Sequence, residues 1–171
     1  MLLNYQGSIF AAILGLVLAA YFANRILAIN VSDEKVSSLS DAIRKGSMAF
    51  LKRQYSWISI FVLVLAILIP TLTDLGVWGS VSFIGGAAFS SLAGFIGMRI
   101  ATAANGRTTE AARDGGTLKA LPVAFRGGAV MGFSVAGLGL LGVGKHLLVM
   151  YLIYLLMIEL RELLLLLLLV L

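Results

Sequence analysis

Side chains capable of acid–base, metal or nucleophilic chemistry are few and scattered in this sequence. Cysteine is absent and His146 is the only histidine, which excludes disulfides and thiolate metal sites and argues against a histidine-based one. Single or adjacent carboxylates lie in the polar stretches that we read as loops: Asp33, Glu34, Asp41, Glu110 and Asp114. Such carboxylates are more typical of solvated partners of Lys and Arg than of metal ligands. We therefore name no catalytic, cofactor-binding or metal-binding residue.

Two short motifs match known sites by spacing alone. Gly137, Gly139 and Gly142 fit the G-x-G-x-x-G pattern of dinucleotide-binding loops, with Glu159 downstream. Such a loop must follow a strand and open a helix beside water, whereas these glycines lie inside an uncharged apolar segment, so we reject it. Asn30 begins a glycosylation sequon, but its loop is expected to be cytoplasmic, so we regard the match as accidental.

The elements that must position these side chains are apolar. The chain of 171 residues is 60% hydrophobic and only 12% charged, about half the charged fraction of a soluble domain. Lipid, rather than water, is therefore expected to cover most of its surface. The net charge of +5 could indicate nucleic-acid binding. We exclude that reading because the basic residues lie in the gaps between apolar segments, where they determine topology.

Four segments are long enough to cross the bilayer as helices: 5–24, 54–73, 75–98 and 127–144. An open sheet would leave its edges unsatisfied in lipid, so we expect an all-α, multi-pass helical bundle in the cell membrane. Near the exit of the second segment, Pro70 is expected to end or kink the helix. The segments 25–53 and 99–126 are expected to be loops, each with some helical order. In the first, Asp41 can pair with Arg44 or Lys45.

The distribution of basic residues predicts the orientation. Eleven of the thirteen lie in the segments 25–53 and 99–126: Arg25, Lys35, Arg44, Lys45, Lys52, Arg53, Arg99, Arg107, Arg113, Lys119 and Arg126. The connection around 74–79 and the N-terminal tail contain none. By the positive-inside rule both basic segments are cytoplasmic and the N-terminus is outside.

Small residues recur at intervals of four in three of these segments. The stripes are Ala11, Gly15, Ala19 and Ala23; Ser82, Gly86, Ser90 and Gly94; and Gly128, Gly132 and Ala136. A flat stripe of small side chains lets helix backbones approach closely, either within the chain or with further helices. We interpret the glycines as packing residues rather than ligand-binding ones.

The tail, residues 145–171, differs from the preceding 1–144. It lacks the small-residue stripe, contains seven consecutive leucines at 163–169, and is interrupted by Glu159, Arg161 and Glu162. It could form a fifth, poor span or a helix lying on the membrane surface. A shifted reading frame would explain the change in composition equally well.

Three stretches resemble the membrane-integral, ion-pumping inorganic pyrophosphatases. They are 43–55 (IRKGSMAFLKRQY), 86–113 (GAAFSSLAGFIGMRIATAANGRTTEAAR) and 124–142 (AFRGGAVMGFSVAGLGLLG), which resemble the approach to the second helix, the third helix with its following turn, and the fourth helix. Their order and spacing agree with that family over residues 8–144.

The resemblance implies part of a larger pump, usually a homodimer, that couples magnesium-dependent pyrophosphate hydrolysis to proton or sodium export. It leaves the choice of ion and any dependence on potassium open. In that family the catalytic residues lie on later helices, so none is carried onto this chain, and we expect it to be inactive alone. Arg99, Asn105 and Arg107 match a family motif and are expected to orient structure rather than bind substrate. The alternative is a small non-enzymatic membrane module that self-associates through its small-residue faces.

Overall fold

The computed structural model describes the backbone of residues 2–170, and side chains except those of 2–5, 145–147, 150, 151, 153, 154 and 162–170. It contains three helical elements, α1 (Leu2–Leu27), α2 (Glu34–Leu72) and α3 (Gly76–Val170), and no strand within that part of the chain. The predicted all-α class is therefore confirmed for the described residues. Three helices are long and apolar enough to cross a membrane, over Gln6–Leu27, Glu34–Leu72 and Gly76–Gly144.

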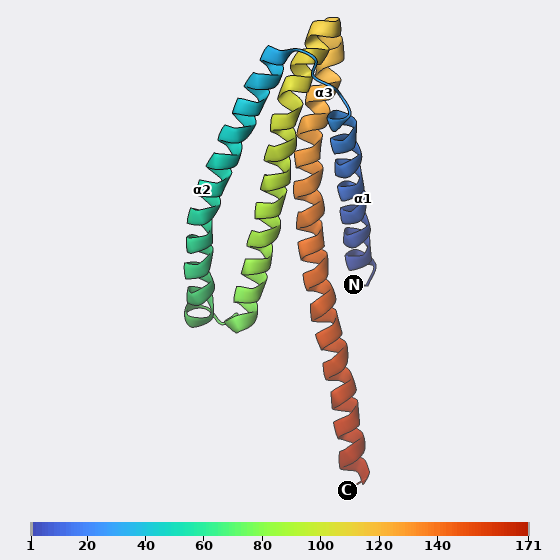
Figure 1. Ribbon diagram of the computed structural model, residues 1–171. Helices are drawn as coiled ribbons and strands as arrows, with labels where there is room; N and C mark the ends of the chain where they lie inside the picture. Colours follow the sequence, from blue (N-terminus) through green and yellow to red (C-terminus); the bar gives the residue numbers. More distant parts are fainter. Residues whose placement is uncertain (1, 171) are drawn as a thin grey trace.

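α3 reverses direction within one element. Gly115 and Gly116 have non-helical dihedrals, and Gly116 has a φ of +63°, in the left-handed region that glycine adopts without a steric penalty. They divide α3 into an ascending arm, residues 76–114, and a descending arm, residues 117–170, which run side by side in opposite directions (Figure 1). The expected third and fourth spans lie on these two arms. The count of four spans and the external N-terminus stay predictions.

Helices extend further than the sequence indicated. The segments 25–53 and 99–126 were expected to be loops, yet only 28–33 and the glycine pair at 115–116 depart from helix there. Asp33 caps α2 by accepting hydrogen bonds from the backbone N–H groups of Lys35 and Val36. α2 runs through Pro70 and ends at Leu72, with Thr73 as its C-cap. At 39 residues and roughly 1.5 Å per residue, α2 is about twice as long as the ~30 Å hydrocarbon core.

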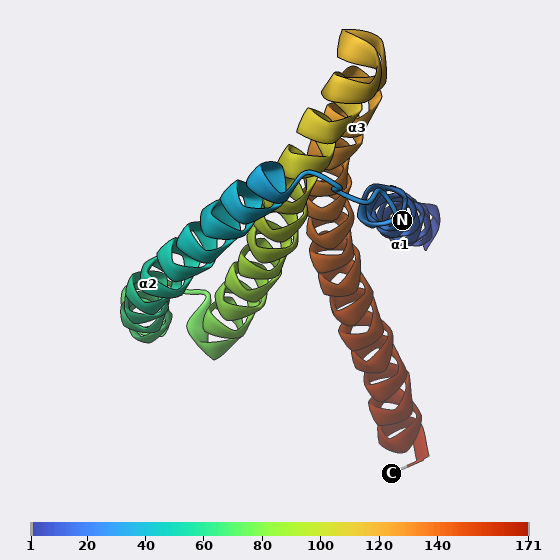
Figure 2. The same cartoon turned by 45° about the horizontal axis from the view of Figure 1, so that its top comes forward.

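The two arms of α3 form the centre of the bundle. α1 and α2 each pack against α3 and make no contact with one another (Figure 2). The α1–α2 loop and the Gly115–Gly116 reversal lie at the same end, while the α2–α3 turn and the N-terminus lie toward the other (Figure 1). This arrangement agrees with both basic segments lying on one side of a membrane. It does not identify which side.

The core is small and lies where α1 crosses the two arms. Ala19, Ile26, Ile100, Ala104 and Val130 form one buried cluster, and Phe22 stacks on Phe133 beside it at a centroid distance of 6.1 Å. Most large apolar side chains elsewhere are exposed, including Phe61, Leu63 and Trp78. A soluble chain would bury such side chains, so this outer surface is suited to lipid.

The small-residue stripes pack unevenly. A Cβ added to Gly15 would lie 3.5 Å from the Phe133 carbonyl oxygen, an ordinary van der Waals distance, whereas one added to Gly94 would lie 3.2 Å from the Tyr55 hydroxyl. In the stripe of the segment 127–144, Gly128, Gly132 and Ala136 face outward. The contacts are instead made by neighbouring residues of the descending arm: Gly127, Val130, Ser134, Gly137 and Leu138 are buried.

The tail continues the descending arm without a break at residue 145. Its backbone is helical through Val170 and projects beyond the other helices (Figure 1). The structure thus gives no turn that would separate a fifth span from the fourth. The side chains of the leucine run at 163–169, and that of His146, lie outside the described residues.

Candidate functional site

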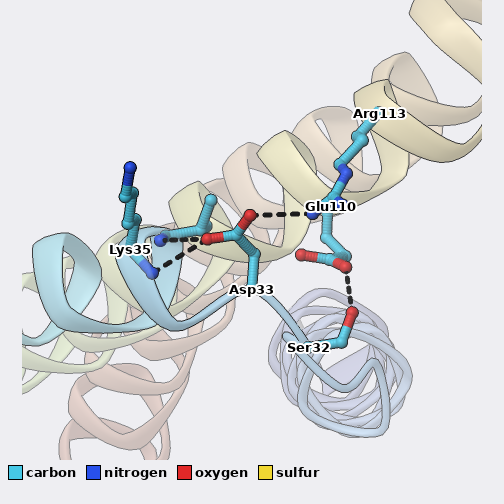
Figure 3. Close-up of polar contacts among 6 residues, drawn as sticks. Ser32, Asp33, Lys35, Glu110 and Arg113 are labelled. Carbon is cyan, nitrogen blue, oxygen red and sulfur yellow. Dashed lines mark hydrogen bonds and ion pairs between the residues drawn. The ribbon is translucent and has the colours of Figure 1, made fainter.

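The polar residues closest to forming a site gather where the α1–α2 loop meets the ascending arm of α3. Ser32 and Asp33 come from the loop and the start of α2, and Glu110 and Arg113 come from α3 (Figure 3). Arg107 lies one turn earlier on α3. Three-residue spacing places the α3 side chains on neighbouring positions of one helix face. The loop and the helix are brought together across about 80 residues of sequence.

Glu110 is the most buried charged residue of this cluster. Its relative exposure is 6%, and Oε1 accepts a hydrogen bond from the Ser32 hydroxyl. The second oxygen, Oε2, is buried and has no hydrogen-bond partner in the described structure. We had taken Glu110 for a solvated loop carboxylate, and this was wrong. The polar stretch around Glu110 is helical, and the contact with the α1–α2 loop buries the side chain.

Asp33 combines a helix cap with an ion pair. Its Oδ1 accepts from the backbone N–H of Lys35 at 2.8 Å and of Val36 at 3.2 Å, and its Oδ2 lies 2.8 Å from Arg113 Nη1. The Val36 and Lys35 N–H groups, with the Arg113 charge, lower the pKa of Asp33 below its usual value. Asp33 thus ties the start of α2 to α3 in its ionised form.

Arg107 connects the end of α1 to α3. Its Nη1 donates to the Ala103 carbonyl at 2.7 Å and its Nη2 to the Leu27 carbonyl at 3.5 Å. Leu27 is the last residue of α1, so the guanidinium contacts a helix C-terminus, where a positive charge is favourable. These contacts are structural, and they support the orienting role expected for this residue.

The other two motif residues point elsewhere. Arg99 and Asn105 are exposed, and Asn105 lines a shallow groove of about 370 Å³ between the two arms with Gly127 and Gly128. The spacing of the three residues, six and then two, turns their side chains to different sides of the helix. The structure therefore does not bring Arg99, Asn105 and Arg107 to one binding point.

The described side chains of this cluster do not make up a magnesium site. Among the described side chains, no group of three or more His, Asp or Glu residues could hold a metal ion. The sequence predicted Asp33 only as a solvated partner of Lys or Arg, and it pairs with Arg113. Ser32 was not predicted to make a contact. An Asp followed by Glu at the start of an amphipathic stretch is a helix-start signal that could have identified the cap. No local pattern predicts the burial of Glu110.

The fold and this cluster define an all-helical membrane protein whose polar residues fasten helices together. The sequence model of the inorganic H+ pyrophosphatase family matches residues 13–168. The chain belongs to this family, and the resemblance noted in the sequence is confirmed.

Several pyrophosphate-energized pumps are similar to the chain. A K(+)-insensitive proton pump of Methanosarcina mazei is 42% identical over 144 residues, covering 84% of this chain and 21% of the pump. The second proton pump of this type from Moorella thermoacetica is 44% identical over 131 residues, covering 77% and 19%. A Bacteroides thetaiotaomicron protein, whose name assigns it to the K(+)-stimulated sodium pumps, is 39% identical over 137 residues, covering 78% and 18%. The chain spans about a fifth of the length of these relatives.

Proposed function

We propose that this chain is the N-terminal, peripheral part of a pyrophosphate-energised ion pump. The observation that carries the proposal is its similarity to such pumps over most of its length. The whole protein would hydrolyse pyrophosphate on the cytoplasmic side of the cell membrane and export protons or sodium ions. It would do so as a homodimer, with magnesium and in some members potassium.

Within such a pump, this chain would provide helices rather than chemistry. Its polar contacts, Ser32 with Glu110 and Arg107 with the end of α1, join the α1–α2 loop and α1 to α3. The described residues do not form a magnesium site, so no step through the metal is assigned to them. The chain alone is therefore expected to insert in the membrane without hydrolysing pyrophosphate.

The membrane arrangement proposed with this function has four spans, an external N-terminus and cytoplasmic segments 25–53 and 99–126. Support comes from the basic residues and from the common end shared by the α1–α2 loop and the glycine reversal. The division between residues 1–144 and a divergent tail at 145–171 is also a proposal. The family match itself extends to residue 168 and so includes most of this tail.

A chimera tests the proposal directly. Residues 8–144 of this chain would replace the corresponding region of the Methanosarcina mazei pump, and vesicles would be assayed for pyrophosphate-dependent proton uptake. Uptake by the chimera, with none by vesicles holding this chain alone, supports a peripheral role. Pyrophosphate-dependent uptake by this chain alone would refute it. A folded, membrane-inserted chimera without any hydrolysis would contradict the family role of these helices.

A second candidate is a non-enzymatic membrane module that self-associates. One observation favours it: Gly128 and Gly132 face outward, and an added Cβ would meet no other atom within 4 Å at either. Such a face lets another helix approach closely. Chemical cross-linking would favour this module if it captured a defined oligomer and if Gly132→Leu abolished that oligomer.

A third possibility is that a separate chain supplies the remaining helices of a pump. Co-expression of the two chains would then restore pyrophosphate hydrolysis.

A further inference from the structure

An apolar groove runs between α2 and the ascending arm of α3. It has a volume of about 310 Å³, and its apolar lining is Ile58, Val62 and Leu63 of α2 with Ile84, Ala87 and Ala88 of α3. These residues belong to the two segments expected to cross the hydrocarbon. The groove therefore opens to lipid rather than to water.

Two polar side chains beside the groove, Tyr55 and Ser59, are already engaged. The Ser59 hydroxyl donates to the Tyr55 carbonyl at 2.7 Å, and the Tyr55 hydroxyl donates to the Ser91 carbonyl at 2.6 Å. Because these bonds are made within the protein, they do not require a polar ligand. The groove suits a hydrocarbon chain.

Two cations lie above one end of this groove. Lys52 precedes Ser59 by seven residues and Arg99 follows Ala88 by eleven, so each shares the helix face that lines the groove. Both side chains are exposed, and neither makes an ion pair or side-chain hydrogen bond within the described part of the chain.

The register of the two helices brings these cations to similar depths. Tyr55 contacts Ser91, and Ser40 lies beside Gly106, so α2 and the ascending arm run antiparallel. This register sets Lys52 level with Gly94, with Arg99 about one and a half turns (~7.5 Å) further along the axis. From Ala88, Arg99 is roughly 17 Å away at 1.5 Å per residue. One leaflet of a ~30 Å hydrocarbon core is about 15 Å deep. The distance from Ala88 to Arg99 therefore matches the distance from the inner end of an acyl chain to its headgroup.

We propose that this groove binds an anionic phospholipid, with an acyl chain along Ala87 and Ala88 and its phosphate between Lys52 and Arg99. The apolar lining selects a chain, and the two unpaired cations select a negatively charged headgroup. A free phosphate ion would match the cations but not the groove. The site is independent of pyrophosphate chemistry and requires only that the chain is in a membrane.

Native mass spectrometry of the whole 171-residue chain in non-ionic detergent tests the proposal. Phosphatidylglycerol and phosphatidylcholine, matched in acyl chains, would be titrated separately. We expect at least tenfold tighter retention of phosphatidylglycerol. Lys52→Gln and Arg99→Gln should each weaken it several-fold, because each removes one charge from the headgroup site. Ala88→Trp fills the groove and should weaken binding of both lipids.

Arg53→Gln is the matched control, because Arg53 is adjacent to Lys52 but on a different face of α2. Its retention of phosphatidylglycerol should equal that of the parent, and helix content by circular dichroism should be equal in all variants. An equal loss in Arg53→Gln would mean non-specific charge attraction and would overturn the proposal. So would displacement of the lipid by inorganic phosphate, or unchanged binding in folded Ala88→Trp.

Discussion

At the residue scale, the end of the bundle near the α1–α2 loop is fastened by a few charged contacts. Glu110 and Ser32 form the most buried of these. We expect Ser32→Ala to destabilise the protein by about 1–3 kcal/mol, since it leaves a buried carboxylate without its donor. In a Glu110→Gln background the same change should cost less, because a neutral amide is less costly to desolvate. Thermal unfolding in detergent of the parent, the two single variants and the double variant measures the coupling between Ser32 and Glu110. Strictly additive losses of stability would contradict that coupling.

Asp33 makes the start of α2 sensitive to acid. Its folded pKa is lowered, chiefly by the Val36 and Lys35 N–H groups, so the stability it adds is present above the unfolded pKa and disappears as pH falls through the folded value. We expect amide exchange at residues 34–37 to accelerate below about pH 4, the unfolded pKa of an aspartate. Asp33→Asn keeps a capping oxygen and should remove this pH dependence, whereas Asp33→Ala should raise exchange at every pH. Identical exchange profiles for the two variants would contradict the assignment.

Sequence reasoning was successful for local contacts and failed for distant ones. The Asp41 pairing was predicted from helical spacing, and Asp41 lies 3.6 Å from Arg44. The burial of Glu110 could not be predicted, since it depends on Ser32, 78 residues earlier in the chain. The contact forms only because the ascending arm of α3 passes the α1–α2 loop in the folded protein. No local sequence pattern predicts it.

At the element scale, the packing of α1 depends on one close approach. A Cβ on Gly137 would lie 2.8 Å from Leu16 Cγ and 3.0 Å from the Ala12 carbonyl oxygen, whereas one on Gly132 would meet nothing within 4 Å. Gly137→Ala should therefore separate α1 from the descending arm and cost about 1–3 kcal/mol. Gly132→Ala, the same change on the same helix, should be close to neutral in this chain. Thermal unfolding compares the two, and similar losses would show that the contact at Gly137 is not specific.

The helices themselves were largely predictable, but their limits and contact faces were not. Apolar length located all four helical segments of the bundle, because a span must satisfy its backbone within the hydrocarbon. Charged residues, however, do not end a helix once it leaves the lipid, so α2 begins at Glu34 rather than near Gln54. The spacing of Gly128, Gly132 and Ala136 indicated a packing face, yet the contacts with α1 lie on the adjacent face around Gly137. Spacing identifies a stripe without identifying its partner.

At the scale of the whole molecule, the antiparallel order of the helices restricts the topology to two orientations. The α1–α2 loop and the Gly115–Gly116 reversal share one end, so they must lie on the same side of a membrane that the helices cross. Most of the basic residues lie toward that end, which makes the cytoplasm its expected location. The α2–α3 turn at 73–75 would then be outside.

Single cysteines distinguish the two orientations, because the chain contains none of its own. We expect Ser38→Cys and Asp114→Cys to resist a membrane-impermeant maleimide in intact cells and to react after the membrane is permeabilised. Asp74→Cys, in the short turn without basic residues, should react in both cases. All three positions are exposed, so a lack of labelling reports the membrane rather than burial. Labelling of Ser38→Cys and Asp114→Cys in intact cells, with Asp74→Cys protected, would reverse the orientation. It would place the Glu110 cluster outside the cell, away from the side on which the pump is proposed to hydrolyse pyrophosphate.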